Sequence, residues 1–536
     1  MVLMERANAS FQHHRESEIH RRKLHHAQRR FVLLAAGIVG VLAGSVAVGF
    51  EYSVHFIELI GVDLSRSLSD YGPLGWACLL SIGGITGGLA GWLTQQFAPE
   101  AGGSGIPHVK AVLLNMRRLR PLVLIPVKIG GGLLALLPGL SLGREGPTIQ
   151  IGAAIGQLAA KVGKAPRRSY PILIAAGAGA GLAAAFNAPL AGFIFVMEEL
   201  KREMSPITYG AALISSVAAV AIARIQLGQG ASFHLANPSP VPMRALPLVV
   251  VLGLLAAFSG VLFNKITIGL ILIRERMKVS RGLAGATVGM LAAACLVLLP
   301  QITGGGHRVA EAVLSGGMDR QFAIGFVAVL FVGKLMLTSS SFATGLPGGI
   351  FAPILVIGAL LGYFCGSIFA TWFPGLNVSP HVFATIGMVS LLAASVRAPL
   401  TGVVLIVEMT QQYSLLYALL LGAFVSYVVA DLLRDKPIYE ALLEHDLHKS
   451  GELGSLTEST VPLDLVVEPD SYMDGRRIKD LGLLNGALIV TIEREGGYII
   501  PNGSTRMKYG DRITVIIGGE QSEEATLRVH DAARAP

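Results

Sequence analysis

The chain has 536 residues, of which 52% are hydrophobic and only 15% are charged, and its formal net charge is +8. At this length such a composition excludes an ordinary soluble protein and predicts a polytopic protein that lies in a lipid bilayer. Seven Lys/Arg and five His fall within residues 1–30. Because no folded basic domain accompanies them, we expect no nucleic-acid partner.

Residues 1–30 lack an apolar core, so they predict a basic cytoplasmic tail rather than a cleavable signal peptide. Basic residues cluster again at 117–120, 161–168 and 274–281. The positive-inside rule would place all of these on the cytoplasmic side. We therefore expect a multi-pass protein of a cell inner membrane or plasma membrane, with both termini in the cytoplasm.

Apolar runs follow one another from residue 31 to residue 447. They begin near Phe31, Leu74, Leu122, Thr148, Ile172, Leu190, Ala211, Leu246, Gly282, Ala323, Phe351, Val382, Val403 and Leu415. Several, such as Leu122–Leu137 and Leu190–Leu200, are shorter than the roughly 20 residues that cross a bilayer. Short hydrophobic segments interrupted by glycine and proline predict broken helices that meet inside the membrane, as in secondary transporters.

The three cysteines, Cys78, Cys295 and Cys365, lie in separate apolar runs without metal-ligand spacing. They indicate small packed side chains rather than disulfides or a metal site. We accordingly expect no metal and no cofactor.

The segment Gly143-Arg144-Glu145-Gly146-Pro147 precedes an apolar run that extends to Val162. It places a glutamate in the first turn of a membrane helix, where free backbone N–H groups and the positive end of the helix dipole favour an anion. Glu145 would compete with a bound anion for these donors. The alternative, taken alone, is an ordinary acidic residue at a helix start.

The chain repeats itself. Residues 177–199 and 387–409, offset by 210, share nine identities in 23 positions, including Glu198 with Glu408. At an offset of 206, Gly143 falls on Gly349 and Pro147 on Pro353. The sequence therefore predicts two halves, about 31–227 and 246–447, joined by an external loop.

Four motifs follow in order: Gly103-Ser104-Gly105-Ile106-Pro107, residues 143–147, Gly349-Ile350-Phe351-Ala352-Pro353, and Tyr439 after Lys436-Pro437-Ile438. Together they resemble the CLC family of chloride channels and chloride/proton antiporters, in its prokaryotic antiporter type. The resemblance covers residues 31–447. It implies an all-α polytopic fold of two inverted-topology repeats of broken, tilted helices, and a homodimer with one anion pathway in each subunit.

The resemblance also implies how chloride, the bound substrate, is held. The hydroxyls of Ser104 and Tyr439 would donate to a central chloride, although a helix cap and a membrane-interface tyrosine are the simpler interpretations. Backbone amides would line the rest of the pathway, from Gly143, Arg144, Gly146, Ile350 and Phe351. Partial charges suit a transported ion because a full cationic charge at the site would trap it.

Two adjacent acids, Glu198 and Glu199, bear on proton coupling. Glu198 matches Glu408 of the other half, as expected of a scaffold residue, whereas Glu199 falls opposite the apolar Met409. Glu199 also stands where antiporters of the family resemble one another in having glutamate. An ionisable residue inside a membrane is costly, so we expect Glu199 to accept protons. A scaffold ion pair with Lys201 or Arg202 is the alternative.

These residues predict a secondary active antiporter that exchanges chloride for protons through the gating acid Glu145. A passive voltage- or pH-gated chloride channel would share nearly every motif and differ chiefly at Glu199. A potassium-transport subunit lacks a potassium-filter sequence here, and a membrane-embedded enzyme lacks a catalytic constellation, so we expect no enzymatic activity. His108, after the first motif, is expected to be a solvated loop histidine rather than a residue that tunes ion access.

The composition becomes that of a small cytoplasmic α+β domain after a linker at 448–460. Within residues 461–530, strands are expected at Val461–Val467, Ala487–Glu493, Tyr498–Pro501 and Arg512–Ile517, and a helix at Ser471–Leu484. Residues 475–481 and 509–513 resemble the TrkA-C regulatory type (RCK C-terminal). That resemblance implies either an unknown small-molecule ligand or a purely structural dimer clamp.

Overall fold

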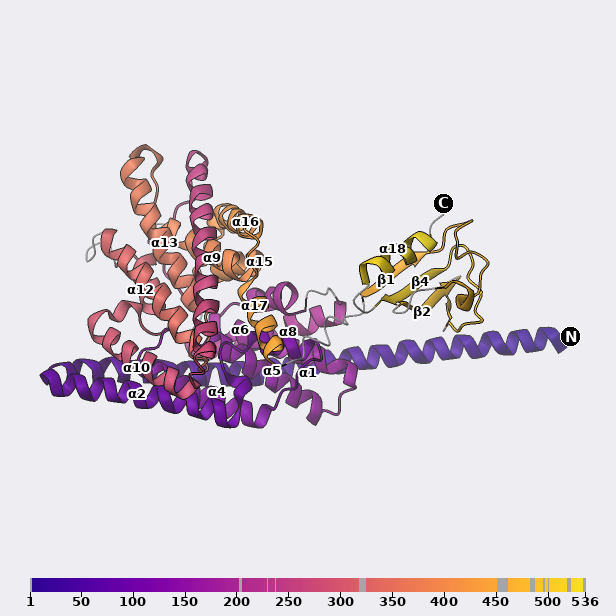
Figure 1. Ribbon diagram of the computed structural model, residues 1–536, viewed down its shortest axis with the longest axis horizontal. Coiled ribbons are helices and arrows are strands. Elements are labelled where there is room, and N and C mark those ends of the chain that lie inside the picture. The colour runs from indigo at the N-terminus through magenta and orange to yellow at the C-terminus, as the bar shows by residue number, and fades with distance from the viewer. Residues whose placement is uncertain are drawn as a thin grey trace. The chain divides into compact units, whose positions relative to one another are not determined.

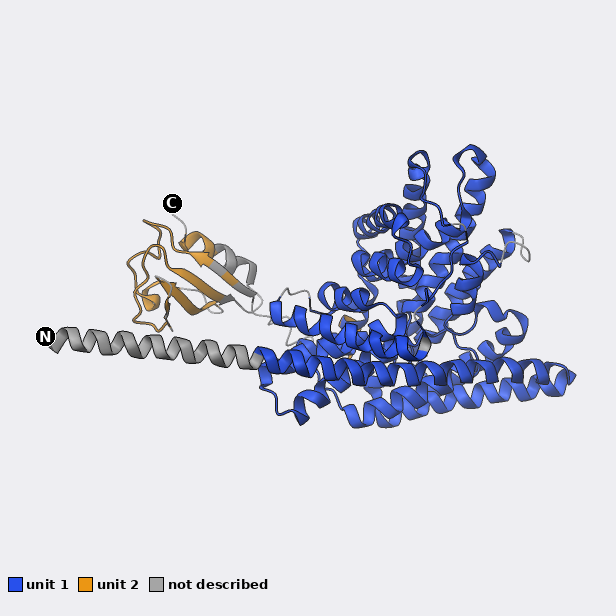
Figure 2. Cartoon of the chain, turned by 180° about the vertical axis from the view of Figure 1, so that it is seen from behind, with its two compact units in different colours: residues 1–443 blue, residues 444–536 orange. Residues whose placement is uncertain are grey.

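The computed structural model describes residues 2–201, 205–228, 230–236, 238–317, 324–450, 461–482, 487–494, 497–499, 501–517 and 522–533. The chain forms two compact units, Met1–Leu443 and Glu444–Pro536, shown in blue and orange in Figure 2. Of the predicted linker, residues 451–460 lie outside the described part.

In the part of the first unit that the structure describes, all named elements are helices (Figure 1). Its helices are α1 Val2–Ser69, α2 Gly72–Phe97, α3 Ile106–Leu113, α4 Pro121–Leu136, α5 Glu145–Val162, α6 Tyr170–Phe186, α7 Pro189–Phe195, α8 Pro206–Leu227, α9 Leu246–Arg276, α10 Arg281–Leu298, α11 His307–Leu314, α12 Ile324–Ala343, α13 Phe351–Trp372, α14 Pro380–Val396, α15 Pro399–Thr410, α16 Leu416–Leu432 and α17 Ile438–Ser450. Nine helical spans in the described part are long and apolar enough to cross a membrane. Others, such as α3, α7 and α11, are too short to do so, which confirms the predicted polytopic fold of broken helices.

Close backbone packing recurs at corresponding places in the two halves. Helix α5 packs against α6 at Gly152 and Gly177, and α13 packs against α14 at Gly358 and Gly387. A Cβ atom on any of these four glycines would collide with the carbonyl oxygen of its partner. Small residues allow membrane helices to approach this closely, so the repeated glycines preserve the same helix crossing twice.

The halves are also joined by a reciprocal pair of glutamates, Glu198 and Glu408, here called the glutamate clasp. The Glu198 carboxylate accepts from the backbone N–H groups of Leu400 and Thr401 at 3.1 and 2.7 Å, and also from the Thr401 hydroxyl. The Glu408 carboxylate accepts from those of Leu190 and Ala191 at 3.1 and 2.9 Å. Each acid thus binds the first turn of the other half's helix, α15 or α7. The predicted scaffold role of Glu198 is confirmed.

The second unit contains an antiparallel sheet with strand order β1-β4-β2-β3. Its elements are β1 Val461–Val466, β2 Ala487–Arg494, β3 Gly497–Ile499, β4 Arg512–Ile517 and α18 Ser522–Ala533. Helix α18, which the sequence analysis did not predict, packs on β1 and β4. The core includes Ile492, Ile513 and Val515. The predicted strands and the α+β character are therefore present.

The helix predicted at Ser471–Leu484 is wrong. The described residues 471–482 form turns with a single short 3₁₀ segment, Ile478–Asp480. Gly475 and Gly482 have φ angles of +73° and +57°, which a right-handed helix cannot accommodate. The backbone turns at these glycines instead of continuing as a helix.

Candidate ion-binding site

The N-terminal ends of α3, α5 and α13 lie next to one another in the first unit. Gly143 and Gly349 exchange two backbone hydrogen bonds of 2.7 Å in an antiparallel bridge. Gly103 donates to the Leu346 carbonyl at 3.0 Å and accepts from Gly348 at 3.1 Å. Since the first N–H groups of each helix lack intrahelical acceptors, three positively polarised helix ends converge on one place.

Gly143 corrects one prediction. Its N–H group was expected to face the anion pathway, but it donates to the Gly349 carbonyl. This hydrogen bond joins the loops of the two halves. The other predicted amides, those of Arg144, Gly146, Ile350 and Phe351, lie at the first turns of α5 and α13, where helix N–H groups have no intrahelical acceptor.

Ser104 lies directly before α3 and is almost fully buried. Its Oγ accepts a hydrogen bond from the Ile106 N–H at 3.3 Å. The hydroxyl oxygen therefore does cap the helix, as the simpler interpretation expected. The hydroxyl hydrogen can still be donated to an anion. Gly146 of α5 packs against this loop so closely that a Cβ atom would collide with the backbone of Ser104 and of Gly349.

Glu145 and Tyr439 are both buried beside these helix ends. The Glu145 side chain is 4% exposed and its carboxyl group contacts the backbone amide of Ala352 in α13. Tyr439 of α17 is 0% exposed, and its hydroxyl group interacts electrostatically with both Glu199 and Glu145. The interpretation of Tyr439 as a membrane-interface tyrosine is therefore wrong.

Two polar atoms of this cluster have no hydrogen-bond partner within the described part of the chain, the Glu145 Oε2 and the Tyr439 hydroxyl. Buried polar groups are normally paired, so such atoms indicate a place that an ion or water occupies. A hydroxyl donor beside helix N-termini fits an anion. A carboxyl group at the same place fits competition with that anion.

A cavity of about 310 Å³ reaches Glu145 and is also lined by Arg144, Glu51, His307 and Ala352. The Arg144 guanidinium pairs with the Glu51 carboxylate of α1 at 2.7 Å. Sequence reasoning missed Glu51 and Ala352. Glu51 had a usable signal, because an acid within a long apolar run marks a functional position, whereas Ala352 is evident only once the first turn of α13 is seen beside Glu145.

Glu199 is 1% exposed and lies in a π-helical turn, Val196–Lys201, after α7. Its carboxylate pairs with the ammonium group of Lys110 in α3 at 2.7 Å. The sequence analysis considered Lys201 and Arg202 as partners and did not predict Lys110, while Arg202 lies outside the described residues. Single π-turns are frequent at functional sites. The pair connects the predicted proton acceptor to α3, the helix that follows Ser104 and Gly105.

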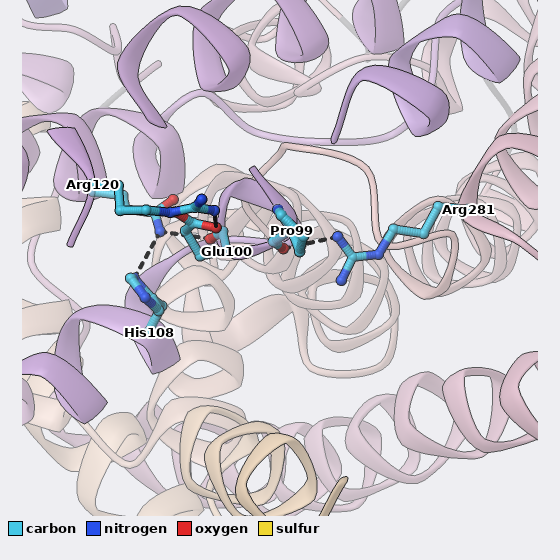
Figure 3. A network of polar contacts seen from close by, with 6 residues as sticks. Pro99, Glu100, His108, Arg120 and Arg281 are labelled. Carbon is cyan, nitrogen blue, oxygen red and sulfur yellow. Dashed lines mark hydrogen bonds and ion pairs between the residues drawn. The ribbon is translucent and has the colours of Figure 1, made fainter. Parts of the chain in front are cut away.

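His108 is buried in a polar network (Figure 3). Its Nδ1 lies 3.2 Å from the Gln150 amide nitrogen, which also donates to the Glu100 carbonyl at 2.8 Å. The Glu100 carboxylate binds the Arg120 guanidinium through two bonds of 2.6 and 2.7 Å. Burial lowers the pKa of His108 to about 4, although the charge of Glu100 opposes this. The expectation of a solvated loop histidine is wrong, since the network buries His108 against α5.

Three comparisons with known proteins agree with this geometry. Residues 86–431 match the family described as voltage gated chloride channel, and residues 463–528 match the TrkA-C domain. The H(+)/Cl(-) exchange transporter ClcA of Vibrio cholerae serotype O1 is 39% identical over 428 residues, covering 78% of this chain and 90% of that protein. The transporter of the same name from Klebsiella pneumoniae is 35% identical over 426 residues, covering 78% and 89%. The crystal structure of a slow cyanobacterial Cl-/H+ antiporter matches with a TM-score of 0.75 and 35% identity, covering 78% of this chain and 99% of that one.

Proposed function

Because this chain belongs to the voltage gated chloride channel (CLC) family, we propose that it is a secondary active antiporter that exchanges chloride for protons across a membrane. It is a transporter and not an enzyme. The exchange transporters that it resembles over most of their length support the antiporter assignment. The transported ions are the only small molecules that the proposal requires, so no cofactor enters it.

The observation that carries the proposal is a pair of buried polar atoms, on Glu145 and Tyr439, that no other described residue pairs with, at the place where three helix N-termini meet. We place chloride there, held by the Tyr439 and Ser104 hydroxyls and by amides of α5 and α13, including that of Ala352. These donors carry partial charges, so they bind chloride without holding it too tightly to leave.

Glu145 then acts as the gate. In its ionised form the carboxylate occupies an anion position against the Ala352 amide and blocks the path. Protonation removes the charge with which it competes for the N–H donors, so the side chain leaves and chloride takes its place. Chloride and protons thereby alternate at one position, which is the physical basis of exchange.

Glu199 supplies the second proton position. It lies away from the cavity that reaches Glu145, and its pairing with Lys110 holds it against α3. Tyr439 is close enough to interact electrostatically with both acids, so it lies in the region that a proton crosses. A proton taken up at Glu199 reaches Glu145 without entering the chloride path on that side.

Membership of the same family supports a proposal about the assembly and location of the protein. We propose a homodimer with one anion pathway per subunit, in a cell inner membrane or plasma membrane, with both termini in the cytoplasm. The TrkA-C match supports a regulatory role for the second unit, through a small ligand or as a clamp between subunits.

The experiment that tests the function is proton movement in liposomes that contain the purified full-length protein under a chloride gradient. We expect wild-type protein to drive protons uphill, in the direction opposite to the flow of chloride down its gradient. Glu199→Ala should retain chloride flux and lose the proton movement. Wild-type chloride flux without any proton movement would contradict the antiporter assignment and indicate a passive channel.

A further inference from the structure

Each half of the membrane unit contains a lysine that is fully buried. Lys128 of α4 and Lys334 of α12 are both 0% exposed. They are separated by 206 residues, the offset that relates Gly143 to Gly349. A buried ammonium group carries a large desolvation cost unless hydrogen bonds compensate for it. Retention of a lysine at both corresponding positions therefore indicates a specific role.

The two lysines make the same kind of contact. Lys128 Nζ donates to the carbonyls of Ala101 and Gly103 at 2.8 and 2.7 Å. Lys334 Nζ donates to the carbonyls of Ile302, Thr303 and Gly304 at 3.1, 3.2 and 2.7 Å. In each half, the bound carbonyls belong to the loop that leads into a short helix, α3 or α11.

Both loops end in a glycine with a left-handed backbone. Gly105 and Gly306, with φ of +84° and +82°, immediately precede α3 and α11. Directly before this glycine, only the first loop carries a hydroxyl, because Ser104 precedes Gly105 whereas Gly305 precedes Gly306. The hydroxyl of the second loop, that of Thr303, donates to the Pro300 carbonyl. The two lysines can therefore be compared directly. Lys128 binds the loop that carries Ser104, and Lys334 binds the corresponding loop, which has glycine in place of that serine.

Most of the backbone carbonyls just before Ser104 accept a hydrogen bond from a side chain. The Pro99 carbonyl accepts from the Arg281 guanidinium at 2.8 Å, as Figure 3 shows, and the Glu100 carbonyl accepts from Gln150. Lys128 takes those of Ala101 and Gly103. A carbonyl oxygen that faced the ion path would repel chloride, because its dipole is negative at the oxygen. Two cationic side chains, Arg281 and Lys128, and the neutral amide of Gln150 hold these oxygens away from the path.

We propose that Lys128 is a positioning residue of the chloride site, an inference that rests on the proposed function. Its ammonium group holds the carbonyls of Ala101 and Gly103 away from the ion, so that the Ser104 hydroxyl and the N-terminus of α3 face it. The ammonium group donates its hydrogen bonds to carbonyls. Its positive charge therefore favours an anion nearby without forming a direct ion pair, which would trap the anion. Lys334 anchors the corresponding loop, which lines the cavity through Gly305 and His307.

Isothermal titration of chloride into purified full-length protein tests this assignment, with Lys334→Met as the matched control for Lys128→Met. Loss of Lys128 should raise the chloride Kd by roughly tenfold or more, the scale of one charge-assisted interaction. Lys334→Met should change it by less than about threefold, because its loop lacks the hydroxyl donor. An equal rise in both variants, or no rise in Lys128→Met, would overturn the assignment.

A second variant covers the case in which Lys128→Met does not fold. Lys128→Gln keeps a hydrogen-bond donor but removes the charge, and a chloride Kd equal to that of wild type in this folded variant would also overturn the assignment. The wild-type titration separates the two hypotheses. Wild-type protein that binds no chloride contradicts the proposed function, whereas normal wild-type binding with unaffected Lys128 variants contradicts only the role of the lysine.

Discussion

The two halves of the membrane unit share a scaffold and differ at the residues with chemistry. Glu145 begins α5, whereas Phe351 begins α13 at the corresponding position. Glu199 corresponds to Met409, and Ser104 to Gly305. In each pair the polar or ionisable residue is in the first half. At these positions the second half supplies backbone amides and apolar side chains, and its own polar contribution to the site is the Tyr439 hydroxyl.

The residues that remain alike explain the scaffold. The glutamate clasp joins Glu198 and Glu408 to opposite helix ends, and the buried lysines Lys128 and Lys334 hold corresponding loops. Duplication thus preserved the contacts that hold the halves together. The differences between the halves then mark where protons and chloride are handled, which a comparison of variants at corresponding positions can test.

The largest expected effect is at Glu145 and its counterpart Phe351. Glu145→Ala removes the only titrating group at the gate in our mechanism, so chloride-driven proton movement should fall at least ~100-fold, the scale of a positioned acid or base. Chloride flux should continue, since no carboxylate blocks the path. Liposome assays that record pH and chloride together measure both quantities.

Phe351→Leu is the control for that comparison because it conserves an apolar side chain at the corresponding helix start. It should keep proton and chloride movement coupled. Uphill proton movement that persists in Glu145→Ala would show that the gate lies elsewhere, and the contrast between the two halves would then lose its functional meaning.

The next effect concerns the ion pair of Lys110 and Glu199. Lys110→Met leaves the Glu199 carboxylate buried without this cation, and removal of one partner of a buried pair costs about 3–5 kcal/mol in the free energy of unfolding. The double variant Lys110→Met/Glu199→Gln should recover most of that loss, because neither charge is then left behind. Thermal melting of the four proteins in detergent measures the coupling.

Met409→Gln is the matched variant in the second half, where no acid stands at the position that corresponds to Glu199. It should leave the ratio of protons to chloride unchanged, whereas any variant that lacks Glu199 should lose proton movement. If the double variant melted no higher than Lys110→Met, the 2.7 Å contact would not be a significant ion pair in the membrane protein.

The glutamate clasp should behave in the opposite way, with similar effects in both halves. Glu198→Ala and Glu408→Ala each leave backbone N–H groups at a helix start without acceptors, which costs about 1–3 kcal/mol of stability. Glu198→Ala should cost slightly more, because Glu198 also accepts from the Thr401 hydroxyl. Neither should change the ratio of protons to chloride. Loss of coupling in only one of the two would mean that the clasp is not a symmetric scaffold.

The sequence predicted much of this arrangement because its signals are local. The three glycine and proline motifs specify helix starts, and the repeated segment around Pro189 and Pro399 revealed the two halves. The scaffold role of Glu198 followed from its match with Glu408. These inferences needed only residues that are close together in the sequence, because local backbone geometry determines where helices begin.

What the sequence could not predict depended on contacts between distant segments. Nothing near Glu199 indicates Lys110 as its partner, because a π-helical turn and the packing of α3 bring them together. Likewise the Gly143 amide binds Gly349 rather than facing the pathway, since a neighbouring loop supplied an acceptor. His108 was expected in a solvated loop, but it lies in α3 and Gln150 from α5 covers it.

The smallest expected effect is the pH-dependent contribution of the ion pair between Arg120 and Glu100 near the first loop. At the corresponding turn of the second half, Pro300–Ile302, Gln301 stands in place of Glu100, so this effect should arise in the first half alone. Burial by itself would raise the pKa of Glu100, but the two bonds from Arg120 and a backbone hydrogen bond lower it below its usual value. A carboxyl group with a lowered pKa stabilises the folded state above its unfolded pKa, about 4.3 for glutamate, and this contribution is lost as pH falls through the folded value.

Arg120→Gln should therefore lower the melting temperature slightly at pH 7, and the difference from wild type should vanish as the pH falls through the lowered pKa of Glu100. Because the Arg120 side chain is 55% exposed, solvent screening limits the effect to less than about 1 kcal/mol. Arg118→Gln removes the same charge from a nearby exposed side chain and should show a weaker dependence on pH. Equal pH profiles for the two variants would mean that net charge, and not the bidentate contact with Glu100, sets the small difference between the two loops.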